Sequence, residues 1–219
     1  MAGIVAPVRT SYLHSHAGRI GVRHTPGGRE RRQLEAHVRA LVRRLPTAAV
    51  GMLPVSLIGL SAFGLDLRLL ALAVLVPALV CLAARAAVDA ATRRLIARAL
   101  VTGIIATALY DLCRGSFLWS GLMDRDPIPH IGVALGLDPA WLAGYGWRYL
   151  GNGTGLALAF LALGLRGTRI GILYGLFVCS NLLLVLLVSP YGEQILFELN
   201  LTTIVMATLG HVIYGAVLG

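Results

Sequence analysis

Long apolar runs separated by short polar segments dominate the chain from residue 47 onward. Six of these runs are the strongest, at 47–64, 68–87, 95–113, 150–165, 169–188 and 195–217. Each approaches the roughly 20 residues that a helix needs to cross about 30 Å of hydrocarbon. The pattern therefore predicts an all-α fold, a polytopic transmembrane helical bundle of about six spans over residues 47–219. A further apolar segment at 128–137 is too short to span, which leaves it re-entrant or interfacial.

The N-terminal part of the chain has a different pattern. Residues 1–28 are rich in Gly, Arg, His and Pro without periodicity, and we expect a disordered, basic cytoplasmic tail. Over residues 29–46, apolar positions recur at helical spacing among arginines, at Leu34, Val38, Leu41 and Leu45. This spacing predicts an amphipathic interfacial helix suited to an anionic membrane surface, and we expect Pro46 to end it.

Composition agrees with lipid as the main solvent of the chain. Hydrophobic residues make up 57% and charged residues 13%, whereas soluble domains carry about 25% charged residues. The net charge of +9 is concentrated in the basic N-terminal segment, so we expect membrane lipids and no nucleic acid as partners. The three cysteines fall in apolar runs and show no metal-binding spacing, so we expect no metal and no cofactor.

Arginine positions predict the topology through the positive-inside rule. The basic N-terminus, the turn containing Arg93 and Arg94, and the turn containing Arg166 and Arg169 are expected on the cytoplasmic side. The opposite side then holds a long connection at 114–149. The all-arginine, lysine-free composition favours a bacterial source, so we expect a multi-pass protein of the inner membrane with both termini cytoplasmic.

Polar residues inside a bilayer are costly and therefore point to function. They gather at the outer ends of the third to sixth predicted spans, at Tyr110, Asp111, Arg114, Trp147, Arg148, Tyr149, Asn152, Asn181, Glu198 and Thr202. This asymmetry predicts a polar cavity that opens outward or laterally beneath the 114–149 connection. The aromatic residues of that connection fit either an interfacial belt or the lining of a cavity for an isoprenoid-like ligand.

Two carboxylates are the candidate catalytic groups. Asp111 and Arg114 are three residues apart and therefore share one helix face. They form either a structural ion pair, or a site in which Asp111 transfers protons beside its basic neighbour. Glu198 shares a face with Thr202 and lies deeper than Glu193. Asp111 and Glu198 are expected as general acid and base, with the other polar residues of the cluster contacting substrate. We interpret His211, near the inner end of the last span, as a helix-packing residue.

Three motifs carry a resemblance to a known group. They are Tyr110-Asp111-Leu112-Cys113-Arg114, Tyr149-Leu150-Gly151-Asn152-Gly153, and the C-terminal run from Gly210-His211 to Gly219. Over residues 95–219 the chain resembles small bacterial multi-pass membrane proteins, a resemblance that implies no particular activity. In architecture alone it is also similar to small membrane-embedded terpene cyclases, which use membrane-buried carboxylates to protonate an epoxide or alkene.

Three functions follow as hypotheses. The first is an integral membrane enzyme that acts by acid catalysis on an apolar, isoprenoid-like substrate, with Tyr110, Trp147 and Tyr149 along the path of a cationic intermediate. The second is a small transporter or a channel coupled to protons or cations, and the third is a non-catalytic membrane scaffold. The sequence leaves the substrate and the oligomeric state open.

Overall fold

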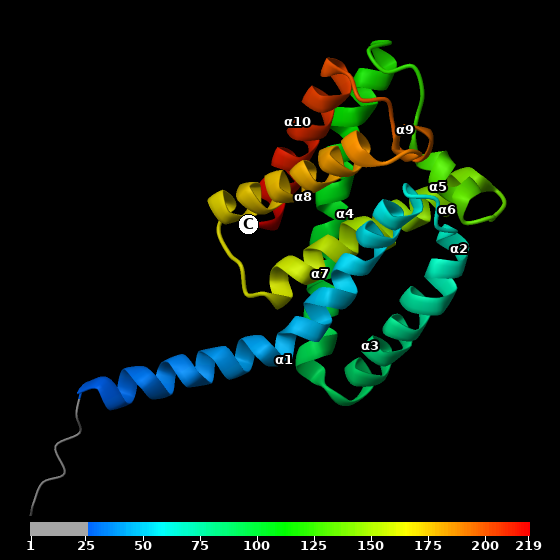
Figure 1. Ribbon diagram of the computed structural model, residues 1–219. Coiled ribbons are helices and arrows are strands. Elements are labelled where there is room, and N and C mark those ends of the chain that lie inside the picture. Colours follow the sequence, from blue (N-terminus) through cyan, green and yellow to red (C-terminus); the bar gives the residue numbers. More distant parts are fainter. Residues whose placement is uncertain (1–25) are drawn as a thin grey trace, which may run out of the picture. The chain divides into compact units, whose positions relative to one another are not determined.

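The computed structural model describes residues 26–219, and the predicted all-helical class is confirmed because no strand occurs in that range. The helical elements are α1 (Pro26–Ser61), α2 (Leu67–Leu70), η1 (Ala71–Leu75), α3 (Val76–Val88), α4 (Ala90–Trp119), α5 (Ile128–Ala134), α6 (Ala140–Gly146), η2 (Trp147–Gly153), α7 (Thr154–Ala162), α8 (Thr168–Val188), α9 (Gly192–Ile195) and α10 (Leu201–Leu218). Figure 1 shows their order along the chain. The elements η1 and η2 are π-helical segments within longer helices.

Five helices within residues 26–219 are long and apolar enough to cross a membrane, namely Arg31–Ser61, Leu67–Val88, Ala90–Trp119, Thr168–Val188 and Leu201–Leu218. The fourth predicted segment, 150–165, is not one of them. In the structure it belongs to a continuous helix over residues 140–162, formed by α6, η2 and α7. This helix begins well before residue 150, and Arg148 lies near its middle.

The chain divides into two compact units, residues 1–37 and 38–219. In the first unit the described residues form the start of α1, where Arg31 Nε lies 3.5 Å from a Glu35 carboxylate oxygen. The predicted disordered tail, 1–28, lies outside the described residues up to position 25. The second unit contains the helical bundle.

The expectation that Pro46 ends a separate N-terminal helix is wrong. The α1 helix continues through Pro46 and Pro54 to Ser61. A proline removes one backbone donor, but an apolar helix retains its remaining hydrogen bonds, and prolines are tolerated within membrane-type helices. The buried positions of α1 begin directly after the first proline, with Thr47 and Ala48.

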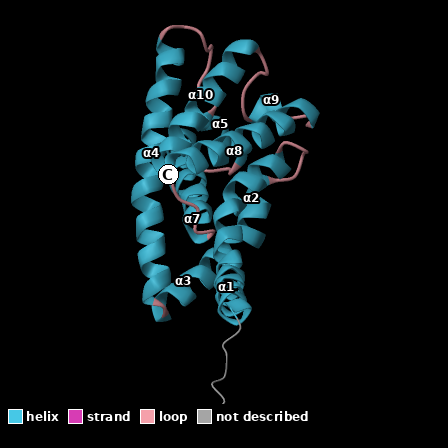
Figure 2. Ribbon diagram, turned by 90° about the vertical axis from the view of Figure 1, so that its left-hand side faces the viewer, coloured by secondary structure: helices cyan, strands magenta, loops and turns pink. Residues whose placement is uncertain are grey.

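The bundle packs through glycines where backbones approach closely. A Cβ added at Gly175 of α8 would overlap the backbone carbonyl of His211 on α10, and one at Gly171 would overlap that of Gly215. The helices α8 and α10 accordingly lie side by side in Figure 1 and Figure 2. Gly51 of α1 makes an equally close approach to the backbone of α7 at Gly155. Such small-residue contacts are typical of helix packing in membranes.

The links between successive helices lie at two ends of the bundle, where hydrogen bonds hold them. At one end, Arg85 Nη2 donates to the Arg43 carbonyl oxygen at 3.2 Å, and the Gly167 N–H donates to the carbonyl oxygen of Gly219 at 3.0 Å. At the other end, the Tyr191 N–H donates to the carbonyl oxygen of Ala62 at 3.1 Å. The first of these ends carries the arginine-rich links.

The α3–α4 link at the arginine-rich end is fixed by a helix cap. Asp89 is the N-cap of α4, where its carboxylate accepts hydrogen bonds from the Thr92 hydroxyl and from the backbone N–H groups of Ala91 and Thr92. These hydrogen bonds, that from the Thr92 hydroxyl foremost, hold the pKa of Asp89 below its usual range. The cap sets where α4 begins. It thereby helps to fix which face of α4 carries Tyr110 and Arg114.

The predicted connection at 114–149 is shorter in the structure than expected. The α4 helix extends to Trp119, and residues from Ala140 onward already belong to the next long helix. The segment between them contains α5, which occupies most of the predicted 128–137 segment. A Cβ at Gly132 of α5 would overlap the backbone of Ala140, so α5 packs directly on α6.

Candidate functional site

A cavity of about 510 Å³ lies within the bundle of residues 38–219. It is bounded mainly by α1, α4, α5, α8 and α10 and by the η2 segment. Most of its lining is apolar and includes Val55, Leu156, Val178, Leu182 and Met206. The volume falls within the roughly 300–1,000 Å³ of small-molecule sites, and the predominance of apolar side chains is also typical of them.

The mouth of this cavity is marked by its exposed lining residues. These residues are Ser56 and Leu60 on α1, Phe63 in the turn directly after it, and Asn181 on α8. Leu60 and Phe63 are 43% and 49% exposed, respectively. Because α1 and α8 both belong to helices of membrane-crossing length, the cavity opens sideways between two apolar helices.

The cavity also adjoins a network of charged side chains. Arg148 of η2 donates from Nε to Asp111 Oδ1 at 2.7 Å, and Arg114 Nε donates to the same oxygen at 3.2 Å. Arg114 also pairs through Nη1 with Asp126 and donates from Nη2 to the Tyr145 hydroxyl oxygen at 2.9 Å. The network therefore joins α4, the start of α5, α6 and η2.

The positive and negative groups of this network differ in whether they line the cavity. Arg114 and Arg148 both line the cavity, whereas Asp111 and Asp126 do not. Their carboxylates pair with the arginines but are not part of the cavity lining. A ligand in the cavity would therefore meet the guanidinium groups before it meets the carboxylates that balance them.

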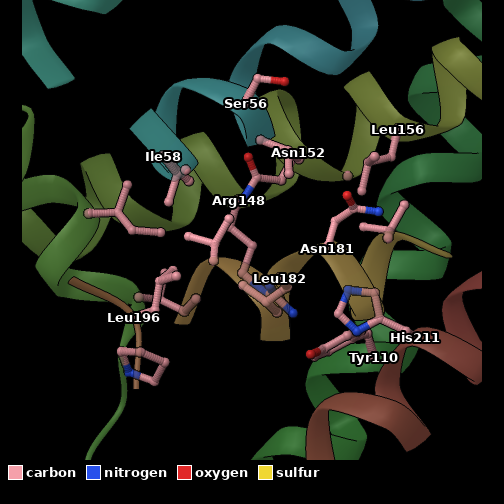
Figure 3. A pocket seen from close by; sticks show the side chains of 18 of the residues that line it. Ser56, Ile58, Tyr110, Arg148, Asn152, Leu156, Asn181, Leu182, Leu196 and His211 are labelled. Atoms are coloured by element: carbon pink, nitrogen blue, oxygen red, sulfur yellow. The ribbon is translucent and has the colours of Figure 1, made fainter. Parts of the chain in front are cut away.

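The rings of Tyr110 and His211 form a pair in the cavity lining, and Arg148 lies against the Tyr110 ring (Figure 3). The guanidinium carbon of Arg148 lies 4.5 Å from the centroid of the Tyr110 ring, and the His211 ring contacts that same ring edge-on at 5.2 Å. His211 Nδ1 lies 2.7 Å from the carbonyl oxygen of Ala207. Since a carbonyl oxygen can only accept, Nδ1 carries the proton, and Nε2 is the acceptor of the neutral ring.

The π-helical segment η2 positions Arg148 and Asn152 at the cavity. Such segments leave backbone groups without their usual helical partners, and they often occur at functional sites. Here the Tyr214 hydroxyl of α10 donates to the carbonyl oxygen of Gly153 at 2.6 Å, and Thr154 Oγ1 donates to that of Tyr149 at 3.0 Å. The irregular backbone is thus held by specific side chains.

The structure gathers half of the predicted site residues at the cavity. Those that line it are Tyr110, Arg114, Arg148, Asn152 and Asn181. Asp111 lies directly behind, bonded to both arginines. Trp147 packs in a neighbouring apolar cluster, and the Tyr149 ring lies 6.5 Å from that of Tyr145.

Glu198 and Thr202 lie away from the cavity. Glu198 is exposed and lines a separate hollow of about 120 Å³ with Asp124 and Arg125. Its neighbours Leu196 and Phe197 are buried toward the main cavity, so the link between α9 and α10 turns the glutamate outward. The structure does not bring Asp111 and Glu198 into one cavity.

Sequence reasoning missed several lining residues. His211, interpreted as a packing residue, does bond to its own helix but also lines the cavity beside Tyr110. Tyr214 and Thr107 line it as well. Helical spacing could have identified them, because residues three apart share one face of a helix. Thr107 and Tyr110 have this spacing on α4, as do His211 and Tyr214 on α10.

Comparisons of the chain with protein-family models, curated proteins and solved structures find no match in any of the three. Within residues 26–219, no cluster of three or more His, Cys, Asp or Glu side chains is arranged to hold a metal ion. Any function must therefore be inferred from the cavity's own shape, lining and charge.

Proposed function

We propose that the chain is a six-span protein of the bacterial inner membrane with both termini in the cytoplasm. Five helices have the required length and hydropathy, and the continuous helix over 140–162 supplies the sixth crossing. The links alternate between two ends of the bundle, and the arginine-rich end is the cytoplasmic one by the positive-inside rule.

Cysteine accessibility tests this topology. In a variant without native cysteines, Pro190→Cys is expected to react with an impermeant maleimide in intact cells. Arg166→Cys is expected to react only after the membrane is permeabilised, because residue 166 lies in the link between α7 and α8. Labelling of both positions from the same side would contradict the six-span arrangement.

We propose further that the protein binds a lipid-like amphiphile, which enters the cavity sideways from the membrane. The observation that carries this proposal is the exposed mouth between α1 and α8, since it joins an apolar cavity to a surface that would face lipid in the six-span arrangement. An apolar chain would occupy the part lined by residues such as Val178 and Leu182. The polar end of the ligand would face Arg148, Asn152 and His211.

Acid catalysis by the two expected carboxylates receives no support from the cavity. A general acid must reach the reacting atom within hydrogen-bonding distance. Neither Asp111 nor Glu198 lines the cavity, and the two guanidinium groups in its lining would oppose a cationic intermediate. The proposed function is therefore ligand binding, without proton donation by these two groups.

Occluding the cavity tests lateral binding. Leu182→Trp introduces a bulky ring into the lining, and it is expected to weaken binding of a fluorescent long-chain amphiphile by at least about tenfold, because the ring fills the chain's space. Leu184→Trp is the matched control, since it makes the same change two residues later at a position that is 56% exposed. Equal binding by both folded variants would contradict a ligand site in this cavity.

A further inference from the structure

We infer that the cavity selects amphiphiles whose head group carries a single negative charge on oxygen, a carboxylate or a phosphodiester. This inference rests on the proposed function, because it names the ligand class of the same cavity. It is carried by the donors that the arginine network leaves directed at the cavity and by the polar atoms around them.

Arg148 has hydrogen-bonding capacity left for a ligand. A guanidinium group has five N–H donors in a planar fork. Arg148 uses Nε and Nη2 for Asp111, and Nη1 makes no hydrogen bond to any residue within 26–219. Both N–H groups of Nη1 and the second N–H group of Nη2 remain. One donor from each terminal nitrogen gives the parallel pair that matches a carboxylate or phosphate group.

Arg114 does not offer a second such site. Each of its three nitrogens already contacts Asp111, Asp126 or the Tyr145 hydroxyl, and the residue is 3% exposed. Only one guanidinium group is therefore equipped to bind a new anion, which favours a head group with one negative charge.

Unpaired polar atoms surround the same end of the cavity. Thr107 Oγ1 and the Asn152 side-chain oxygen are buried and make no hydrogen bond to any described residue. Leaving a buried polar group without a partner is costly, so both residues favour a ligand with polar atoms here. The Thr107 hydroxyl can donate to a head-group oxygen, whereas the Asn152 side-chain oxygen and His211 Nε2 can accept from a head-group hydroxyl.

A ligand series at fixed chain length tests this inference in the unmodified protein. Binding of palmitate, 1-hexadecanol and hexadecylamine would be compared by competition against a fluorescent long-chain amphiphile in detergent micelles at neutral pH. We expect palmitate to bind at least about tenfold more tightly than the alcohol, because a charged partner strengthens the hydrogen bonds of Arg148. The amine is expected to bind most weakly.

The source of the head group is distinguished by a second arm. Phosphatidylglycerol would be offered in nanodiscs in competition with palmitate. Displacement of palmitate would identify the phosphodiester of a membrane lipid as the preferred head group, and retention of palmitate would identify a free long-chain carboxylate. Both results support a singly charged oxyanion.

The variant Arg148→Gln assigns the selectivity to its residue. It is expected to bind palmitate and 1-hexadecanol with similar affinities, whereas Arg125→Gln, outside the cavity, should keep the wild-type preference. If Arg148→Gln does not fold, the ligand series in the unmodified protein still decides. Equal binding of the three ligands by the unmodified protein would overturn the anion preference and leave the proposed function standing. Failure of all three ligands to bind would overturn both.

Discussion

Replacing Arg114 with alanine is expected to lower the free energy of unfolding by about 3–5 kcal/mol, the usual cost of removing one partner from a buried ion pair. The variant would leave Asp126 without its guanidinium partner and the Tyr145 hydroxyl with one hydrogen bond fewer. Asp111 would lose one of its two guanidinium partners and keep Arg148. Unfolding in mixed micelles with increasing SDS measures the change.

Arg125→Ala is the control for this prediction. Arg125 is exposed and donates from Nη2 to the backbone carbonyl oxygen of Glu193 at 3.0 Å. Exposed charges contribute little, so a change below about 1 kcal/mol is expected. If Arg114→Ala changed stability no more than Arg125→Ala does, the network would not hold α4, α5 and α6 together.

Substituting Gly175 with alanine is expected to force α8 and α10 apart. The added Cβ would overlap the carbonyl of His211, and the neighbouring atoms are also backbone, at 3.1 Å for the His211 carbonyl carbon and 3.3 Å for the Gly215 Cα. Backbone cannot rotate away as a side chain does, so we expect destabilisation of about 1–3 kcal/mol or more. Ligand affinity should fall with it, because the same contact positions His211 at the cavity.

Gly115→Ala gives the opposite expectation and makes a sharp comparison. A Cβ at this position of α4 has no atom within 4 Å. Alanine is the better helix former, by about 1 kcal/mol at most, so Gly115→Ala should leave stability unchanged or raise it. The same SDS titration compares the two variants, and similar losses for both would show that close packing of α8 on α10 is not what Gly175 provides.

The helical class and the positions of most long apolar helices were predictable because they depend on local hydropathy. The fourth predicted segment, 150–165, differs in its bounds from the helix over 140–162 because Arg148 and the glycines near it interrupt the apolar pattern, whereas the chain remains helical through a π-helical segment. Pro46 was misinterpreted for a related reason, since a helix with apolar neighbours can continue past a proline. Local rules therefore located the helices better than their ends.

The candidate site was predictable only in part because it depends on how helices turn against each other. Tyr110 and Asp111 are adjacent, but successive residues on a helix point about 100° apart, so one lines the cavity and the other lies behind it. The contact of Tyr110 with His211 joins α4 to α10, and no local sequence pattern indicates a contact between residues so far apart in the chain. Glu198 was placed on a helix face, but it lies in the link before α10.

The charge at the cavity also changes the ligand that the sequence suggested. An isoprenoid-like substrate processed through a cation requires a wall that is anionic or offers open aromatic faces. The Tyr110 face is already covered by Arg148, and the charged lining residues are both arginines. An apolar chain remains a good fit to the cavity, but the head group that fits it is anionic.

Photochemical crosslinking tests lateral ligand binding most directly. A long-chain carboxylate with a photoreactive group near the end of its chain would be added to membranes containing the protein, and the crosslinked residues would be identified by mass spectrometry. Binding in the cavity predicts adducts on lining residues such as Val178, Leu182 and Met206, reduced by excess palmitate. Adducts confined to outward-facing residues such as Leu184 and Leu187, and unaffected by palmitate, would contradict it.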